Sequence, residues 1–160
     1  MKEKNPTTSC TRALFPCKFF VMHYETTDHP KQTEIAEIYE NLKKFNLAHL
    51  ENQIVRELAV FAHEDGERLA GGLSADTHGN WLEILYLWVD EKYRGQGLGT
   101  NLLAKAEAEA LQRGCSYAFL NTFGFQAKGF YEKQGYTEVF VLEAYPETGT
   151  RHYMKKTLQA

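Results

Sequence analysis

The sequence predicts a single α/β domain with a mixed, mostly antiparallel sheet, and two observations support this fold class. Three predicted strands joined by short turns follow one another from Leu58 to Val89, which is the order of an antiparallel meander. A glycine-rich turn, a helix and a further strand come next, and this order indicates a right-handed parallel crossover. The chain has 160 residues, 43% hydrophobic and 24% charged, so it is long enough to bury a core of its own.

The composition argues against several classes of protein. The formal net charge is only −3 and no dense run of Lys and Arg occurs, so nucleic-acid binding is disfavoured. Cys10, Cys17 and Cys115 are odd in number and lack metal-type spacing, which favours reduced, structural thiols. No apolar run reaches the length of a signal peptide or a membrane span. We therefore expect a cytoplasmic protein without a membrane partner.

The first third of the chain begins with a segment of little pattern. Residues 1–17 show no periodicity and predict an N-terminal arm, so the predicted domain covers residues 18–160. Aromatic and β-branched residues predict a strand over residues 18–24. Apolar residues at helical spacing then predict a helix over residues 35–45 that lies on a sheet. Residues 46–56 are ambiguous.

Hydrophobic periodicity and turn signals define the remaining elements. The helix that opens at about Leu98 repeats apolar residues every four positions up to Ala110 and ends at Arg113-Gly114. A second helix covers residues 125–134. The predicted strands cover residues 58–62, 68–75, 81–89, 116–120, 136–142 and 151–156.

The glycine-rich turn is the most informative segment. Gly95, Gly97 and Gly99 alternate between the strand 81–89 and the helix that opens at about Leu98. Glycines leave backbone N–H groups unobstructed, and the N-terminus of a helix adds the positive end of its dipole. The turn therefore predicts a binding site for a polyphosphate.

Two common phosphate-binding motifs do not fit this turn. A P-loop requires Gly-Lys-Ser/Thr at the start of the helix, whereas the chain has Gly99-Thr100-Asn101, without a lysine. A dinucleotide fingerprint needs a third glycine, and this chain has Thr100 in its place. It also needs an acidic residue at the end of the next strand, and that strand ends in Leu120-Asn121 without one. Hydrolysis of a nucleoside triphosphate and dinucleotide binding are both disfavoured.

Two segments resemble motifs of the GNAT superfamily of N-acetyltransferases. Arg94–Gly99, which reads R-G-Q-G-L-G, matches the family pattern R/Q-x-x-G-x-G/A, and Ala127–Tyr136 resembles the family segment A-x-x-F-Y-x-K-x-G-F/Y. The resemblance covers residues 18–157. One departure is Gly124, where many family members carry Asn. Asn121–Ala127 is instead similar to a bacterial subset with T-F-x-F-Q-A, some members of which modify small amines or antibiotics.

The resemblance implies a sheet of six to seven strands that splays at its parallel pair and carries helices on both faces. It also implies acetyl-CoA as the co-substrate, with its pyrophosphate on the glycine turn and its pantetheine arm beside the preceding strand. The residues implied in CoA binding are Leu87, Trp88, Val89, Arg94, Gly95, Gln96, Gly97, Leu98, Gly99, Thr100, Asn121, Ala127, Phe130 and Lys133.

The implied chemistry is the attack of a primary amine on a thioester. A free amine has a pKa near ~10 and is mostly protonated at neutral pH, so a group must accept its proton. Tyr131 matches the tyrosine that protonates the CoA sulfur in many family members, and the alternative is an aromatic residue that packs on an amphipathic helix. Glu83 lies in an otherwise apolar strand where members often place a glutamate that relays protons through water. Its alternative is a solvent-facing glutamate.

The acceptor side of the site has little pattern. Glu143 and Tyr145 are candidates for acceptor contacts, and Glu51, Asp76 and Glu147 would complete an acidic rim that attracts a cationic amine. Ordinary solvated surface charge is the simpler explanation of each of these carboxylates. The histidines show no metal-type spacing, so we expect no metal.

The predicted function is acetyl-CoA-dependent acetylation of a small primary amine or an antibiotic-like molecule. Two alternatives stay open, namely acetylation of a protein N-terminus or lysine, and binding of acyl-CoA without turnover. The sequence also leaves open whether the chain forms a homodimer.

Overall fold

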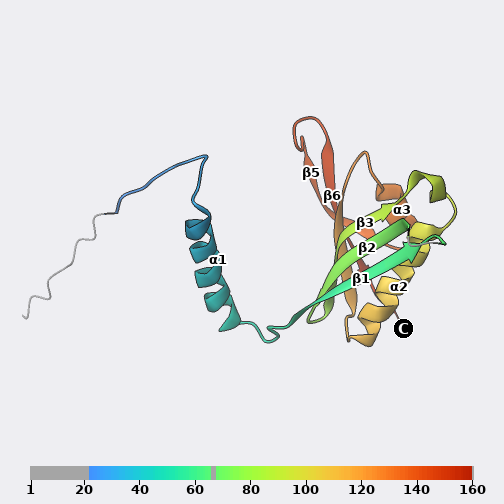
Figure 1. Cartoon of the computed structure of the whole chain (residues 1–160), viewed down its shortest axis with the longest axis horizontal. Coiled ribbons are helices and arrows are strands. Elements are labelled where there is room, and N and C mark those ends of the chain that lie inside the picture. The colour runs from blue at the N-terminus through green and yellow to red at the C-terminus, as the bar shows by residue number, and fades with distance from the viewer. Residues whose placement is uncertain (1–21, 66–67, 160) are drawn as a thin grey trace, which may run out of the picture. The chain divides into compact units, whose positions relative to one another are not determined.

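The structure is a computed structural model that describes residues 22–65 and 68–159 (Figure 1). The chain divides into two units between Lys44 and Phe45, and each unit is described by itself. The elements in chain order are α1 (Gln32–Leu47), β1 (Val55–His63), β2 (Leu69–His78), β3 (Trp81–Val89), a 3₁₀ helix (Glu91–Tyr93), α2 (Leu98–Gln112), β4 (Tyr117–Phe123), α3 (Lys128–Lys133), β5 (Thr137–Glu143) and β6 (Thr150–Thr157).

The N-terminal part of the chain confirms one predicted element and leaves others open. The predicted helix is present as α1, extended by a few residues at each end. The predicted arm 1–17 and residues 18–21 of the predicted strand lie outside the described residues, so the predicted domain boundary stays a prediction. Residues 22–24, the described end of that strand, are not in a strand. The packing of α1 on a sheet also stays a prediction, because the two units are described separately.

The second unit contains one mixed sheet of six strands in the order β1-β2-β3-β4-β6-β5. Neighbouring strands are antiparallel except for β3 and β4, which are parallel. The meander of β1, β2 and β3 and the crossover through α2 confirm the predicted mixed, mostly antiparallel sheet. Helices on both faces of this sheet stay a prediction. β1 begins at Val55, earlier than the predicted start at Leu58.

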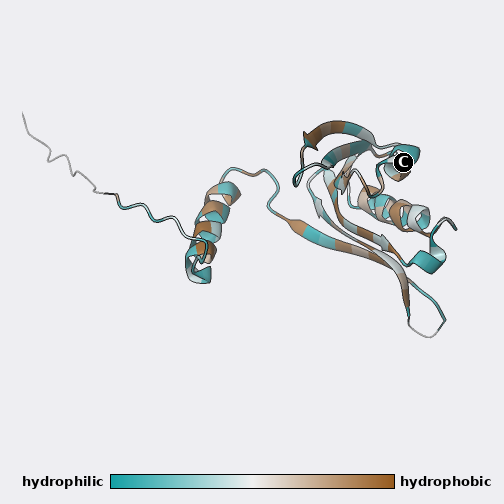
Figure 2. Cartoon of the chain, turned by 90° about the horizontal axis from the view of Figure 1, so that it is seen from above, coloured by the Kyte–Doolittle hydropathy of each residue, from teal (hydrophilic) through white to brown (hydrophobic). Residues whose placement is uncertain are grey.

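Helices α2 and α3 pack on the same face of the sheet and share its core. Leu102, Ala106 and Ala110 of α2 are buried, as their four-residue spacing predicts. A Cβ at Gly71 of β2 would lie 3.0 Å from the carbonyl oxygen of Trp88 and 3.2 Å from the Leu102 side chain, so this glycine lets α2 approach the sheet closely. Figure 2 shows α2 against the strands, with hydrophobic and hydrophilic bands alternating around it.

The parallel strands β3 and β4 separate after a short paired stretch. They pair only over Trp81–Ile84 and Tyr117–Leu120. The register between β3 and β2 then shifts by one residue at Leu85, and a bulge of this kind bends the strand. Beyond it, Tyr86–Val89 stays paired with β2 while β4 stays paired with β6. The predicted splay at the parallel pair is confirmed, and it leaves backbone groups on the facing edges without a strand partner.

Candidate active site

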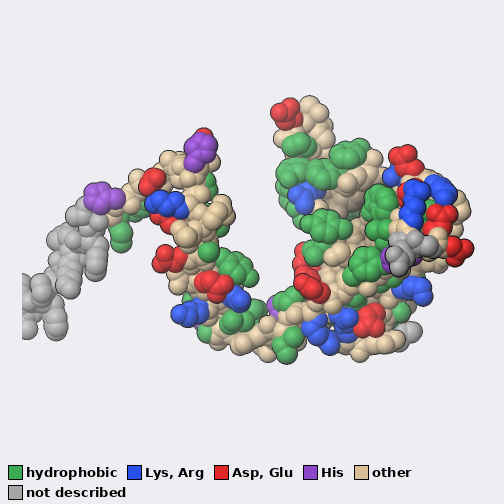
Figure 3. Space-filling model, viewed as in Figure 1, with side chains coloured by type: hydrophobic (Ala, Val, Ile, Leu, Met, Phe, Trp, Pro, Cys, Tyr) green, Lys and Arg blue, Asp and Glu red, His purple; other side chains and the backbone are tan. Residues whose placement is uncertain are grey.

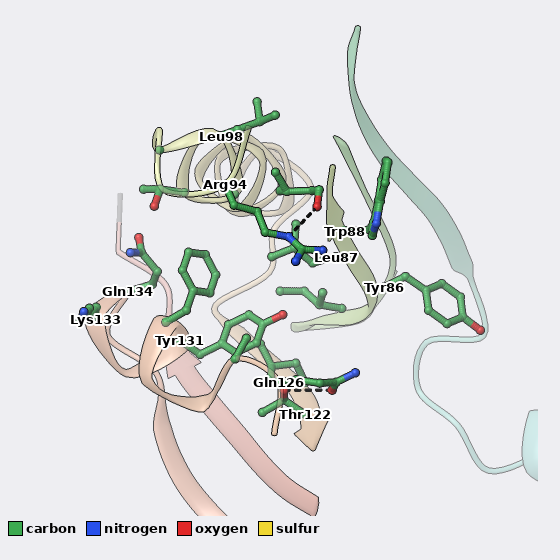
Figure 4. Close-up of a pocket in the computed structure, with 18 of the residues that line it drawn as sticks. Tyr86, Leu87, Trp88, Arg94, Leu98, Thr122, Gln126, Tyr131, Lys133 and Gln134 are labelled. Carbon is green, nitrogen blue, oxygen red and sulfur yellow. Dashed lines mark hydrogen bonds between the residues drawn. The ribbon is translucent and has the colours of Figure 1, made fainter. Parts of the chain in front are cut away.

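A cleft of about 1020 Å³ opens where β3 and β4 separate (Figure 4). Its walls are the second half of β3, the glycine turn with the first turn of α2, the end of β4, and α3 with the turn that precedes it. This volume lies at the upper end of the usual range for small-molecule and cofactor pockets, about 300–1,000 Å³. The cleft can therefore hold a large ligand.

The glycine turn forms one wall of the cleft and keeps its backbone amides accessible. Gly95 and Gly97 have left-handed φ angles of 74° and 84°, which strain any residue with a Cβ, and no atom lies within 4 Å of that Cβ position. Gly97 precedes α2 and provides no side-chain cap, so the first N–H groups of the helix lack an intrahelical partner. Gly99 has no such φ, and its Cβ would lie 3.5 Å from the Phe130 ring. Backbone conformation therefore requires Gly95 and Gly97, whereas a Cβ at Gly99 would make only an ordinary van der Waals contact.

Side chains within the turn hold it in this conformation. Arg94 donates from Nε to the carbonyl oxygen of Val89 at 3.1 Å, and Gln96 donates from Nε2 to the carbonyl oxygen of Lys92 at 2.8 Å. Gln96, a predicted CoA-binding residue, does not line the cleft, and its side-chain amide is used inside the turn. A contact between Gln96 and a ligand would therefore come from its backbone.

The other predicted CoA-binding residues line the cleft. Figure 4 shows the side chains of Tyr86 and Trp88 projecting away from Tyr131, so Trp88 offers the cleft its backbone rather than its indole ring. The predicted residues that line the cleft are Leu87, Trp88, Val89, Arg94, Gly95, Gly97, Leu98, Gly99, Thr100, Asn121, Ala127, Phe130 and Lys133.

Tyr131 of α3 lies in the middle of the cleft (Figure 4). Its side chain is only 7% exposed and packs edge-on against the rings of Phe130 and Tyr136, at centroid distances of 5.1 and 5.8 Å. Burial raises the pKa of Tyr131 to about 12. The hydroxyl is therefore protonated at neutral pH and can donate a hydrogen bond to a ligand in the cleft.

Glu83 lies on the other face of β3. Leu82 and Ile84, on either side of it, are buried under the helices, and Glu83 is half-exposed on the opposite face, beside its β4 pairing partner Phe119. It does not line the cleft, so the structure does not bring Glu83 and Tyr131 together. A base at this position would act through water, as the sequence-based expectation specifies.

The two predicted acceptor residues also lie outside the cleft. Glu143 is exposed at the end of β5, where its backbone pairs with Thr150. The Tyr145 hydroxyl accepts a hydrogen bond from Nη1 of Arg151 at 3.0 Å, and the Tyr145 ring lies 5.8 Å from the ring of Phe123. The sequence analysis missed Arg151, because nothing in its local sequence indicates these partners.

The turn between β4 and α3 contains further residues that the sequence analysis did not assign. Gln126 lines the cleft, and its Oε1 accepts hydrogen bonds from the Phe123 N–H at 2.8 Å and the Thr122 hydroxyl at 3.3 Å. A Cβ at Gly124 would clash with the Thr150 hydroxyl, so a larger residue at this position would require the Thr150 side chain to move. The T-F-x-F-Q-A segment is the available sequence signal for this turn.

The described residues do not favour a nucleophilic cysteine, a metal site or a membrane span. Cys115 is 3% exposed, and burial raises the pKa of its thiol, which is the opposite of what a nucleophilic cysteine requires. Within residues 22–65 and 68–159, His, Cys, Asp and Glu side chains form no group of three or more that could hold a metal ion. The helices in these ranges include none with both the length and the hydropathy of a membrane span. Cys10 and Cys17 lie outside the described residues.

Comparison with known proteins identifies the family. The model of the acetyltransferase (GNAT) family matches residues 19–136. The chain belongs to the GNAT acetyltransferase family. This GNAT protein is 43% identical over 107 residues to blasticidin-S acetyltransferase of Streptomyces morookaense, over 64% of this chain and 79% of that relative. It is 37% identical over 102 residues to an acetyltransferase of Agrobacterium fabrum, over 64% of this chain and 74% of that relative.

A solved structure supports the same assignment. The crystal structure of an acetyltransferase from Bacillus cereus matches this GNAT protein with a TM-score of 0.78 at 30% identity, over 84% of this chain and 98% of that chain. The family resemblance inferred from the two sequence motifs is confirmed, and so are the fold class and the prediction that the protein is an acyltransferase.

Proposed function

We propose that this GNAT acetyltransferase transfers the acetyl group of acetyl-CoA directly to the primary amine of a small, antibiotic-like molecule in a ternary complex. The cleft at the β3–β4 splay carries this proposal, because it has an amide-lined glycine turn in one wall and the Tyr131 hydroxyl in its middle. A site that binds the polyphosphate of CoA and a proton donor near the thioester are two of the features that this reaction needs.

The residues of the cleft fit CoA. Backbone amides from Arg94 to Thr100, with the N-terminal end of the α2 dipole, are suited to the pyrophosphate. Over Leu87–Val89, β3 pairs with β2 along one edge, and the other edge, which faces β4, has no strand partner. Free backbone groups on that edge can pair with the amides of the pantetheine arm. Lys133 also lines the cleft and offers a positive charge. The acetyl thioester would then lie near Tyr131.

The transfer makes one bond and breaks another. The amine nitrogen bonds to the acetyl carbonyl carbon, the carbon–sulfur bond breaks, and the sulfur leaves as a thiolate that takes up a proton. A thiol has a pKa of about 8.5, so complete proton transfer from Tyr131 with a pKa of about 12 is uphill by roughly 3–4 units. Tyr131 therefore acts first as a hydrogen-bond donor whose bond strengthens as charge develops on the sulfur, and the proton follows.

The attacking amine must lose a proton as well. We assign its removal to Glu83 acting through water, because Glu83 is the carboxylate on β3 beside the splay, although it lies on the outer face. Backbone N–H groups on the free edge of β3 are suited to stabilise the negative charge that develops on the carbonyl oxygen. Each of these roles is independent of the acceptor's identity.

The similarity to blasticidin-S acetyltransferase supports a small-molecule acceptor. A protein N-terminus or lysine is the second candidate acceptor, and the open cleft beside the exposed rings of Tyr86 and Phe125 does not by itself distinguish the two. A third candidate, a module that binds acyl-CoA without turnover, lacks a use for the Tyr131 hydroxyl.

A thiol-release assay tests the proposal. The full chain is mixed with acetyl-CoA and with a panel that contains small amines, blasticidin S, and peptides with free N-termini or lysines. We expect CoA release with at least one small amine and none with the peptides. Release with peptides alone would favour a protein acceptor. Tight binding of acetyl-CoA with no release over the whole panel would show a binding module.

A further inference from the structure

Arg151 occupies an unusual position on the sheet. Met154, three positions further along β6, is fully buried under α2 and α3. Because side chains alternate between the two faces of a strand, Arg151 lies on the opposite face. The centre of its guanidinium lies 5.5 Å from the ring centroid of Phe123, 5.4 Å from that of Tyr145 and 5.8 Å from that of Tyr153. The cation is thus surrounded by three aromatic rings, a setting that favours positive charge.

The charge of Arg151 has no counter-charge among the described residues. Its hydrogen bonds go to two neutral groups, from Nε to Oδ1 of Asn121 at 2.8 Å and from Nη1 to the Tyr145 hydroxyl at 3.0 Å. None of the ion pairs within residues 22–65 and 68–159 includes Arg151. A guanidinium has five N–H groups. Two of the five are used in these bonds, so both N–H groups of Nη2 and one N–H group of Nη1 are free to bind a ligand.

Arg151 is connected to the cleft through its own partners. Asn121, which accepts the bond from Nε, lines the cleft. Phe125 also lines the cleft, is 82% exposed, and stacks on Phe123 at a centroid distance of 5.3 Å. A molecule that enters the cleft from this face therefore meets an aromatic surface that leads to the guanidinium.

The loop that carries Tyr145 is closed by its own backbone. The Tyr145 N–H donates to the carbonyl oxygen of Gly149 at 2.8 Å, and a Cβ at Gly149 would lie 2.7 Å from the carbonyl oxygen of Tyr145. This closure fixes the position from which the Tyr145 hydroxyl holds Arg151. Figure 3 shows hydrophobic side chains gathered over β5 and β6 in this region.

We infer that Arg151 binds a carboxylate of the acceptor, so the acceptor of this enzyme is an amine that also carries a carboxylate. The inference rests on the proposed function and specifies its substrate class. A planar guanidinium matches a carboxylate with two parallel hydrogen bonds, and a half-buried cation without a counter-charge gains most from such a partner. Arg151 is a specificity-determining residue in this arrangement, and it takes no part in proton transfer.

The inference predicts a change in KM that depends on the acceptor. The acceptors to be compared are amino acids that carry their amine at the α or the ω position. Each amino acid is paired with a partner that lacks the carboxylate, either the carboxamide or the decarboxylated amine. We expect the best acceptors to carry a carboxylate. Arg151→Gln should raise KM for these acceptors about 10- to 100-fold, the value of a lost charged hydrogen-bond pair, and leave KM for acetyl-CoA unchanged. The same variant should leave KM for the carboxylate-free partners nearly unchanged.

Two further variants keep the test decisive. Lys155→Gln removes an exposed positive charge four positions along the same strand and should leave all KM values unchanged. Arg151→Lys keeps the charge without the planar fork and should give an intermediate KM, which serves if Arg151→Gln does not fold. Best acceptors without a carboxylate, or an equal effect on both members of each pair, would overturn the inference. Absence of CoA release with every amine would instead refute the proposed function.

Discussion

Tyr131 and Tyr136 lie five positions apart in one motif and have different surroundings. The Tyr136 hydroxyl is 2.9 Å from Oε1 of Glu107, whose Oε2 in turn accepts a bond from Lys156 at 2.6 Å. The Tyr131 hydroxyl faces the cleft. The Tyr136 hydroxyl therefore contributes to stability, and the Tyr131 hydroxyl is available for chemistry.

Removal of the Tyr131 hydroxyl should affect the rate and leave the fold intact. We expect Tyr131→Phe to lower kcat about 10²-fold, at the low end of the range for acid–base assistance, with little change in KM for acetyl-CoA. Tyr136→Phe should lower the free energy of unfolding by about 1–3 kcal/mol and leave kcat nearly unchanged. Steady-state kinetics and denaturant titration of both variants check this pair. An unchanged kcat in Tyr131→Phe would remove this residue from the mechanism.

The pKa of Tyr131 also predicts the pH dependence of the rate. Because that pKa is raised to about 12, Tyr131 stays protonated throughout the range in which the acceptor amine loses its proton. The value of kcat/KM should rise with pH up to the pKa of the amine, near ~10, and then level off. A pH–rate profile from pH 6 to 10.5 tests this. A fall in rate between pH 8 and 10 that disappears in Tyr131→Phe would contradict it.

At the scale of elements, the glycine turn contains one glycine, Gly97, that its backbone conformation requires and another, Gly99, that it does not require. Gly97 has a φ of 84°, so Gly97→Ala should lower the free energy of unfolding by about 1–2 kcal/mol and raise KM for acetyl-CoA. Gly99→Ala is the matched control, since its Cβ would make an ordinary contact at 3.5 Å with Phe130 and its stability should stay within about 0.5 kcal/mol of wild type. Thermal unfolding of the two variants decides the point, and an equal loss in both would show that the φ angle is not the reason.

The elements could be predicted from the sequence where local pattern determines them. Alternating strands, the spacing of Leu102 and Ala106, and the glycines of the turn are local signals, and each predicted element of the second unit is present. The bulge at Leu85, which opens the cleft, depends on pairing with β2 and has no local signal. Arg151 and its partner Asn121 are thirty residues apart, so their contact follows from strand order alone.

At the scale of the molecule, the sheet is both scaffold and site. The same splay that interrupts the hydrogen bonds between β3 and β4 creates the cleft, and the paired part of both strands contributes residues to the core under α2 and α3. Family membership was predicted from two motifs and is confirmed by the match over residues 19–136. The acceptor could not be predicted, because the residues proposed to recognise it, Arg151 with Asn121 and Tyr145, come from different elements of the fold.

The buried tyrosines predict alkaline instability of the whole fold. Burial raises the pKa of Tyr131 to about 12, and burial together with the charge of Glu107 raises the pKa of Tyr136 further. A tyrosine in the unfolded chain has a pKa near ~10, so the stability is fully present below pH ~10 and is lost as the pH rises above it. We expect Tm to fall between pH 10 and 12, and to fall less steeply in Tyr136→Phe. Parallel curves for the variant and wild type would contradict this assignment.

Direct acetyl transfer from CoA to the amine is tested most directly with a labelled acetyl group. Acetyl-CoA with an isotopic label in the acetyl group is mixed with stoichiometric enzyme and an acceptor amine, and the protein, CoA and amine fractions are separated at early times. We expect the label to move from CoA to the amine in step with thiol release, without labelled protein at any time. Label that accumulates on the protein before it reaches the amine would contradict direct transfer, and label that stays on CoA would contradict transfer altogether.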